Sequence, residues 1–154
     1  MIKTYFKSVV LAAYLLFVGI SGSFAQCKNI AKKQCFPALA PYVQNGQFNS
    51  ARLSPGENAE VALTFYAATS YRLLVCSEAV LGDVSYKVID VDKNELFNSK
   101  KAESKQFDFN VATTQQLFVI VDVPPLDSPN KISPEGCVSI LVGFTTTPVS
   151  KNVK

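Results

Sequence analysis

The 154-residue sequence contains no histidine. This absence excludes Ser-His-Asp and Cys-His catalysis, imidazole metal sites and the usual general base near neutral pH. It also lacks a glycine-rich phosphate loop. Residues 128–131 match the S-x-x-K pattern of penicillin-binding enzymes, but they lie in a proline-rich stretch rather than at the start of a helix. No acidic pair is set apart for glycoside hydrolysis. We therefore expect no enzymatic activity and no cofactor.

The first 25 residues have the pattern of a cleavable secretory signal peptide. Lys3 and Lys7 form a short basic region, and twelve uncharged residues follow at 9–20. Small residues then occupy the positions before a predicted cut after Ala25. The uncharged stretch is shorter than the roughly 20 apolar residues that span a bilayer. The sequence predicts a secreted or periplasmic protein with no membrane span after cleavage.

Removing this signal nearly neutralises the chain. Lys3 and Lys7 leave with it, so the mature sequence has 13 basic and 12 acidic residues. A mixed surface of this kind gives no electrostatic reason for binding nucleic acid. The cluster of Lys28, Lys32 and Lys33 is expected to be the solvated face of a short helix.

Four cysteines follow the predicted cut: Cys27, Cys35, Cys76 and Cys137. They form no C-x-x-C pair, and without histidine their spacing matches no zinc site. An even number of cysteines in an exported chain predicts two disulfides.

A predicted helix over residues 28–34 limits how these cysteines can pair. Eight residues of helix separate Cys27 from Cys35 by roughly 12 Å at about 1.5 Å per residue. A disulfide requires Cα atoms within about 7 Å. Each of the two should therefore reach Cys76 or Cys137, which would staple an N-terminal arm to the rest of the protein.

Alternation of apolar and polar residues predicts β-strands from about residue 47 onward. Strands are expected at residues 61–66, 71–76, 84–89 and 107–111, with shorter pieces near 48 and 96. The four-residue turn after Tyr66 predicts that the first two of these strands form a hairpin. In this pattern Phe65, Phe107 and Phe109 are core residues.

Two further segments, 117–121 and 138–142, are almost continuously apolar, as expected of central strands buried on both faces. The total is about eight strands, which predicts an all-β antiparallel sandwich of jelly-roll type with a short, disulfide-stapled N-terminal helix. We divide the chain into a signal peptide (1–25), a helical arm (26–46), the sandwich (47–144) and a C-terminal tail (145–154).

Residues 82–96 (GDVSYKVIDVDKNEL) resemble the central strand–turn–strand of bacterial pre-peptidase C-terminal domains, which are small secreted jelly rolls. The wider layout, over roughly residues 60–144, resembles small exported bacterial β-sandwich proteins. The chain departs from the module pattern at Thr114-Gln115-Gln116, where a glycine-tyrosine turn is usual, and it carries an additional N-terminal arm. The resemblance implies the fold and, by analogy, a non-catalytic role.

Asp90, Asp92 and Asn94 place oxygen ligands at alternating positions, as a calcium loop does. Glu95 and Lys101 stand where an EF-hand needs glycine and glutamate. Such residues are also ordinary in hairpin turns. The alternative is a different kind of calcium site, completed by Asp83 or Asp127 from neighbouring loops.

Aromatic side chains at strand or loop edges are the remaining candidates for binding. Tyr42, Phe48, Tyr66 and Tyr71 could stack on a sugar or anchor a protein. Alternatively, they cover the sheet beneath the arm. The first functional hypothesis is a secreted, non-catalytic module that binds a protein or a glycan of the cell envelope. The alternative is a small-ligand or calcium-binding protein that uses the loop carboxylates.

Overall fold

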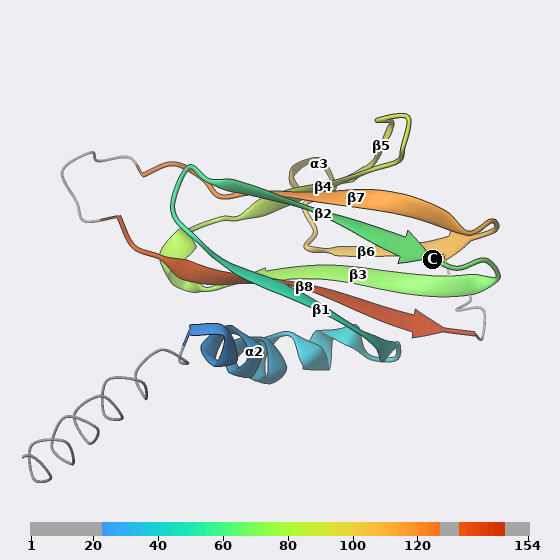
Figure 1. Cartoon of the computed structure of the whole chain (residues 1–154), viewed down its shortest axis with the longest axis horizontal. Helices are drawn as coiled ribbons and strands as arrows, with labels where there is room; N and C mark the ends of the chain where they lie inside the picture. Colours follow the sequence, from blue (N-terminus) through green and yellow to red (C-terminus); the bar gives the residue numbers. More distant parts are fainter. Residues whose placement is uncertain (1–22, 127–132, 147–154) are drawn as a thin grey trace, which may run out of the picture.

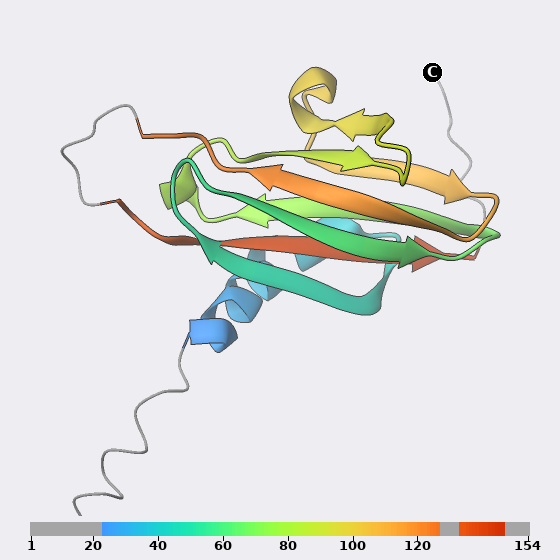
Figure 2. The same ribbon diagram turned by 45° about the horizontal axis from the view of Figure 1, so that its top comes forward.

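The computed structural model describes residues 23–126 and 133–146, which form two packed β-sheets (Figure 1). The elements are α2 (Ser23–Gln34), η1 (Phe36–Leu39), β1 (Val43–Leu53), β2 (Asn58–Phe65), β3 (Thr69–Ser77), η2 (Ala79–Leu81), β4 (Ser85–Ile89), β5 (Glu95–Asn98), α3 (Ser99–Ala102), β6 (Gln106–Val111), β7 (Gln115–Asp122) and β8 (Gly136–Thr145). Figure 2 shows α3 and β5 on the opposite side of the sandwich from α2.

The strand order is that of a jelly roll. One sheet has the order β1-β8-β3-β6 and the other β2-β7-β4-β5. β1 pairs with β8, β2 with β7, β3 with β6 and β4 with β5, and all four pairs are antiparallel. This nesting is what results when one long hairpin is wound into two sheets. The predicted all-β jelly-roll sandwich is confirmed.

The core lies between the two sheets. Its largest fully buried side chains include Tyr86, Phe65 and Leu73. They stand at alternate positions of their strands, because successive side chains of a strand point to opposite faces. Each fully buried side chain of this size contributes roughly 1.5–3 kcal/mol of hydrophobic stabilisation.

An N-terminal arm, α2 with η1, covers the outer face of the β1-β8-β3-β6 sheet (Figure 1). Cys27 and Ala31 are four residues apart and share one face of α2; Cys35 follows the helix, with its N–H bonded to the Ala31 carbonyl, and all three are almost completely buried. Ala31 and Cys35 pack with Leu74 and Leu141 on the outer face of the sheet. α2 ends at Gln34, and Pro37 then stands in the first turn of η1, a position that proline tolerates because no backbone N–H is needed there.

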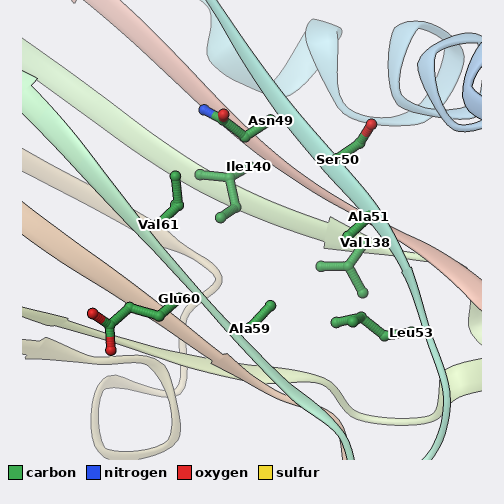
Figure 3. A pocket seen from close by; sticks show the side chains of 9 residues that line it. All are labelled: Asn49, Ser50, Ala51, Leu53, Ala59, Glu60, Val61, Val138 and Ile140. Carbon is green, nitrogen blue, oxygen red and sulfur yellow. The ribbon is translucent and has the colours of Figure 1, made fainter.

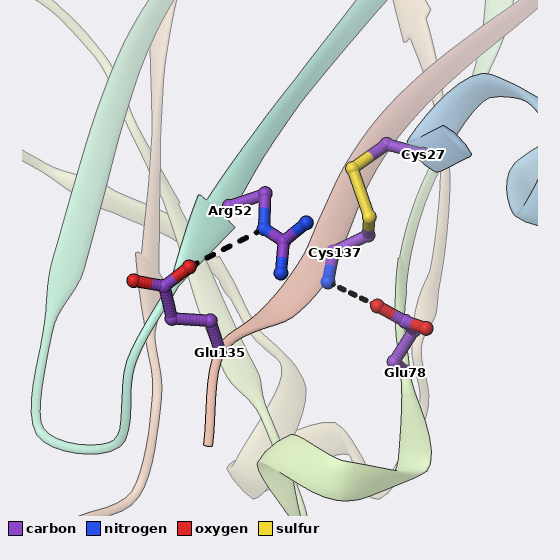
Figure 4. Close-up of a disulfide and its surroundings, with 5 residues drawn as sticks. All are labelled: Cys27, Arg52, Glu78, Glu135 and Cys137. Atoms are coloured by element: carbon purple, nitrogen blue, oxygen red, sulfur yellow. Dashed lines mark hydrogen bonds and ion pairs between the residues drawn. A yellow bond between two sulfur atoms is a disulfide. The ribbon is translucent and has the colours of Figure 1, made fainter. Parts of the chain in front are cut away.

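Two disulfides attach this arm to the sheet. Cys27 bonds Cys137 on β8, with Cα atoms 5.3 Å apart (Figure 4). Cys35 bonds Cys76 on β3, with Cα atoms 6.2 Å apart. The prediction of two disulfides, each linking the arm to the sheet, is confirmed. Beside the first bridge, the Glu78 carboxylate accepts a hydrogen bond from the Cys137 N–H.

Arg72 on β3 fastens the end of the arm a second time, without a covalent bond. Its guanidinium donates two hydrogen bonds of 2.8 Å to the Asp108 carboxylate on β6. It also donates to the carbonyls of Ala38 and Ala40 at 3.1 and 2.6 Å. The same group lies 4.6 Å from the centre of the Tyr42 ring. A bidentate, stacked arginine of this kind fixes both partners in direction as well as distance.

The predicted hairpin between the strands around Leu63 and Leu73 is wrong. β2 and β3 lie in different sheets, and the chain crosses between the sheets at residues 66–68. β3 is apolar on both faces and needs a central position, which it has between β8 and β6. β2 alternates between exposed and buried positions, as an edge strand does.

The two continuously apolar segments also differ from each other. Residues 138–142 on β8 are buried on both faces, as predicted, because α2 and η1 cover the outer one. Residues 117–121 on β7 are central, yet Phe118 and Ile120 are only half-buried. The described helix on this side of the sandwich, α3, packs on β4 and β5, and α2 and η1 pack on the other sheet. The prediction of burial on both faces is therefore wrong for β7.

Element boundaries moved at the N-terminal side. β1 begins at Val43, before the predicted boundary at residue 47, and α2 begins at Ser23 rather than at 28. Most of the predicted signal peptide, the S-x-x-K segment at 128–131, Asp127 and most of the predicted tail lie outside the described residues. None of the helices described here has the length and apolar character needed to cross a bilayer.

Candidate functional site

The two lateral sides of the sandwich, where the edge strands of the two sheets face each other, are built differently. At the β5–β6 side, the rings of Phe97, Phe107 and Phe109 stack in a row with centroids 4.6 Å apart. All three are partly buried and pack against the core. Because large rings fill the space between the sheets, this side is closed.

The β1–β2 side is open instead. A groove of about 220 Å³ lies there, between the edge strands β1 and β2 (Figure 3). The residues lining this edge groove are Asn49, Ser50, Ala51, Leu53, Ala59, Glu60, Val61, Val138 and Ile140. Figure 3 shows the side chains of Ala51, Ala59 and Val61 on either side of it, while the Glu60 carboxylate points away. Small alanines stand here where phenylalanines fill the opposite side.

The β2 edge beside this groove carries unpaired backbone groups. Val123 N–H donates to the Glu57 carbonyl, and β2 then pairs with β7 in an unbroken register. In an antiparallel ladder, the residues that bond the neighbouring strand alternate with residues whose backbone groups point away from it. The N–H and C=O groups of Asn58, Glu60, Ala62 and Thr64 therefore point to the free edge. Within the described part of the chain, no partner is found for them.

The rim of the edge groove is acidic on the β2 side. Glu60 is exposed, and its carboxylate has no ion pair or hydrogen bond among the described residues. On the β1 side, Arg52 is already neutralised by Glu135 at 3.4 Å (Figure 4). The Glu57 carboxylate accepts a hydrogen bond from the Ser54 N–H. A carboxylate without a partner thus stands near the start of β2, a strand whose outer edge is unpaired.

The predicted binding aromatics do not form a platform. Tyr42 and Tyr71 are only 7% and 4% exposed, and Phe48 is half-buried against Phe36 beneath the arm. Burial, together with the negative charge of Asp108, raises the pKa of Tyr42. Only Tyr66, at 62% exposed, offers its ring to solvent. Phe48 lies on the outer face of the sheet beneath the arm, whereas Tyr71 fills the core between the sheets.

The predicted calcium ligands are not all brought together, because Asp83 is apart from the turn that holds Asp90, Asp92 and Asn94. Asp83 precedes β4 and Asp90 follows it, so they lie at opposite ends of that strand. The Asp90 carboxylate accepts hydrogen bonds from the backbone N–H groups of Asp92 and Asn94 and from the Asn94 side chain. These bonds, first the one from the Asn94 side chain, lower the pKa of Asp90. The described residues contain no group of three or more acidic or cysteine side chains able to share a metal ion. Calcium binding at this turn stays a prediction.

A second hollow, of about 350 Å³, lies beside α3. Two of its charged side chains, Lys105 and Asp83, already pair with each other. Lys105 Nζ lies 2.7 Å from Asp83 Oδ1 and also donates to the Val84 carbonyl. The Lys105 ammonium lowers the pKa of Asp83. This paired, polar hollow has less to offer a ligand than the edge groove.

Sequence reasoning missed the edge groove because it depends on strand order. The alternation predicted over residues 61–66 indicated that Val61 faces inward, but it neither reached Ala59 nor showed which strand would lie next to them. The small size of Ala51 and Ala59 is the feature of the sequence that marks this side.

Comparison with known proteins finds one weakly similar structure to report and assigns the chain to no family. No family model and no curated protein matches the chain. Among solved structures it is similar to PliG of Aeromonas hydrophila, a periplasmic inhibitor of g-type lysozyme. The two are 7% identical, with a TM-score of 0.47, over 64% of this chain and 85% of PliG. A similarity of this size identifies neither a family nor a partner.

Proposed function

We propose that this protein is an exported, non-catalytic binding module that engages a protein partner at the β1–β2 side of its sandwich. The observation that carries the proposal is the coincidence, at one side, of an apolar groove and a strand edge with unpaired backbone groups. Protein edges of this kind are normally blunted by bulges, lysines, proline or a covering segment. β2 carries one exposed charge, Glu60, but no lysine, proline or bulge within Asn58–Phe65, and no described segment covers its outer edge.

Export is supported by the signal pattern of residues 1–25 and by the two disulfides of the arm. Disulfides persist in oxidising compartments such as the periplasm and the extracellular space. A non-catalytic role is supported by the absence of histidine and by the use of all four cysteines as bridges.

A protein partner suits the groove better than a small molecule or a glycan. Pockets for small molecules usually begin at about 300 Å³ and enclose their ligand. The edge groove is smaller and open along two strands, a shape that takes side chains from a neighbouring segment. A glycan would need exposed aromatic rings to stack on. Of the four aromatic candidates, Tyr66 is the one with an exposed ring. The resemblance to pre-peptidase C-terminal domains stays a prediction and is not needed for the proposal.

Site-specific cross-linking tests this function. A photoreactive side chain at Ala62 on β2 is expected to cross-link a protein of the exported fraction of the native cells. The matched control carries the same group at Leu96 on β5, which is also exposed but lies on the closed side. A band present with Ala62 and absent with Leu96 is the expected result. Equal labelling from both positions, or none from Ala62, would contradict the proposal.

A further inference from the structure

We infer that the partner binds as an extended segment that adds a strand to β2, with apolar side chains at alternate positions and a basic residue between them. The inference rests on the proposed function and specifies its partner. It follows from three properties of one place: the direction of the backbone groups of β2, the lining of the edge groove, and the charge of Glu60.

The backbone supplies the first contact. Glu60 and Ala62 direct N–H and C=O groups to the free edge, so an antiparallel segment can exchange hydrogen bonds with both. This is the mode called β-augmentation, in which main-chain bonds give affinity and pockets for alternate side chains give specificity. Independent support for the alternation comes from β4, where Tyr86 N–H points away from β7 and donates to Ser99 Oγ.

The groove defines the inward side chains of the segment. Residues directly opposite each other in a sheet share a face. Segment residues opposite Ala59 and Val61 therefore point between the sheets, where Ala51 and Ile140 line the groove. Because Ala51 and Ala59 are small, the protein's own side chains do not fill this side of the sandwich. The space that remains suits apolar side chains of moderate size.

Glu60 defines the residue between them. Its side chain lies on the outer face, and the segment residue opposite it shares that face. An opposite charge in a directly cross-strand pair is stabilising, and a like charge is destabilising. Glu60 has no counter-ion among the described residues. A lysine or arginine of the segment, placed opposite Glu60, would therefore supply the missing positive charge.

Two other occupants fit less well. A second copy of this chain, pairing β2 with β2, would bring no basic residue, since Asn58–Phe65 contains none. The chain's own C-terminal residues 147–154 (PVSKNVK after Thr147) contain no lysine flanked on both sides by apolar residues. Neither β2 of a second copy nor this C-terminal segment supplies the alternation that the edge requires.

The test uses an octapeptide, Ser-Thr-Val-Lys-Val-Thr-Val-Ser, and measures its dissociation constant by fluorescence anisotropy with the full mature protein. Ala62→Pro removes one edge donor without breaking the β2–β7 ladder and is expected to weaken binding about tenfold. Ala62→Thr, which keeps the N–H, is expected to bind as the wild type does. Glu60→Lys is expected to weaken binding about threefold or more, and a peptide with glutamate in place of lysine to recover it.

The peptide itself provides a test that cannot be confused with misfolding. N-methylation of its lysine amide removes a bond to β2, whereas N-methylation of a valine amide, which points away, leaves binding unchanged. Equal loss from both methylations, or no measurable binding, would overturn the inference. Cross-linking from Ala62 would then still support the module function with a differently shaped partner. A dimer that blocks the peptide, or a gain in affinity on removing residues 147–154, would assign the edge to a second copy or to the chain's own tail and overturn the inference as well.

Discussion

Replacing Cys27 and Cys137 together by alanine is expected to lower the free energy of unfolding by about 2 to 5 kcal/mol. The bridge joins residues 110 apart, so it closes most of the chain into one loop and strongly restricts the unfolded ensemble. It also holds the N-terminal part of α2 against β8. Urea unfolding followed by circular dichroism measures the difference.

Reduction of the wild-type protein provides the control for this pair. It opens both bridges and is expected to destabilise at least as much as the double substitution. If the double alanine variant unfolds at the same urea concentration as the wild type, the bridge does not hold the arm, and the interpretation of α2 as a stapled element is wrong.

Arg72→Ala is expected to lower the free energy of unfolding by about 2 to 3 kcal/mol. The substitution leaves the partly buried Asp108 carboxylate without its bidentate partner and the carbonyls of Ala38 and Ala40 without a donor. The side chains of Arg72 and Asp108 are only 12% and 27% exposed, so water replaces these bonds poorly.

Arg52→Ala is the matched control for this substitution. Arg52 also pairs with a carboxylate, that of Glu135, but at 3.4 Å and with side chains 42% and 60% exposed. An ion pair of this kind contributes about 0 to 1 kcal/mol. Thermal and urea unfolding of both variants should therefore separate them clearly. An Arg72→Ala variant no less stable than Arg52→Ala would show that the arginine does not fasten the arm.

The fold class and the disulfides could be predicted from the sequence because both depend on local patterns. Alternation at positions such as Tyr86 and Val88 indicates a strand wherever that strand lies in the sheet. The helical spacing of Cys27 and Cys35 excludes one pairing without knowledge of the fold, and the structure confirms this.

Properties that depend on strand order could not be predicted in the same way. The turn after Tyr66 has the length of a hairpin, but the jelly-roll winding sends β2 and β3 to different sheets. β7 is as apolar as β8, yet only β8 lies under the arm. The buried positions of Tyr42 and Tyr71 and the open groove at Ala59 likewise follow from which elements become neighbours.

The central claim is that a partner docks on the β2 edge, and amide hydrogen exchange of the free and partner-bound protein tests it most directly. In the free protein, the N–H groups of Glu60 and Ala62 are expected to exchange quickly, because they point to the free edge. When the partner found by cross-linking is bound to the unmodified protein, exchange of these two amides should slow about tenfold or more. The amides of Glu95–Asn98 on the closed side should stay unchanged. Continued fast exchange at Glu60 and Ala62, with new protection at β5 or β6, would contradict the account.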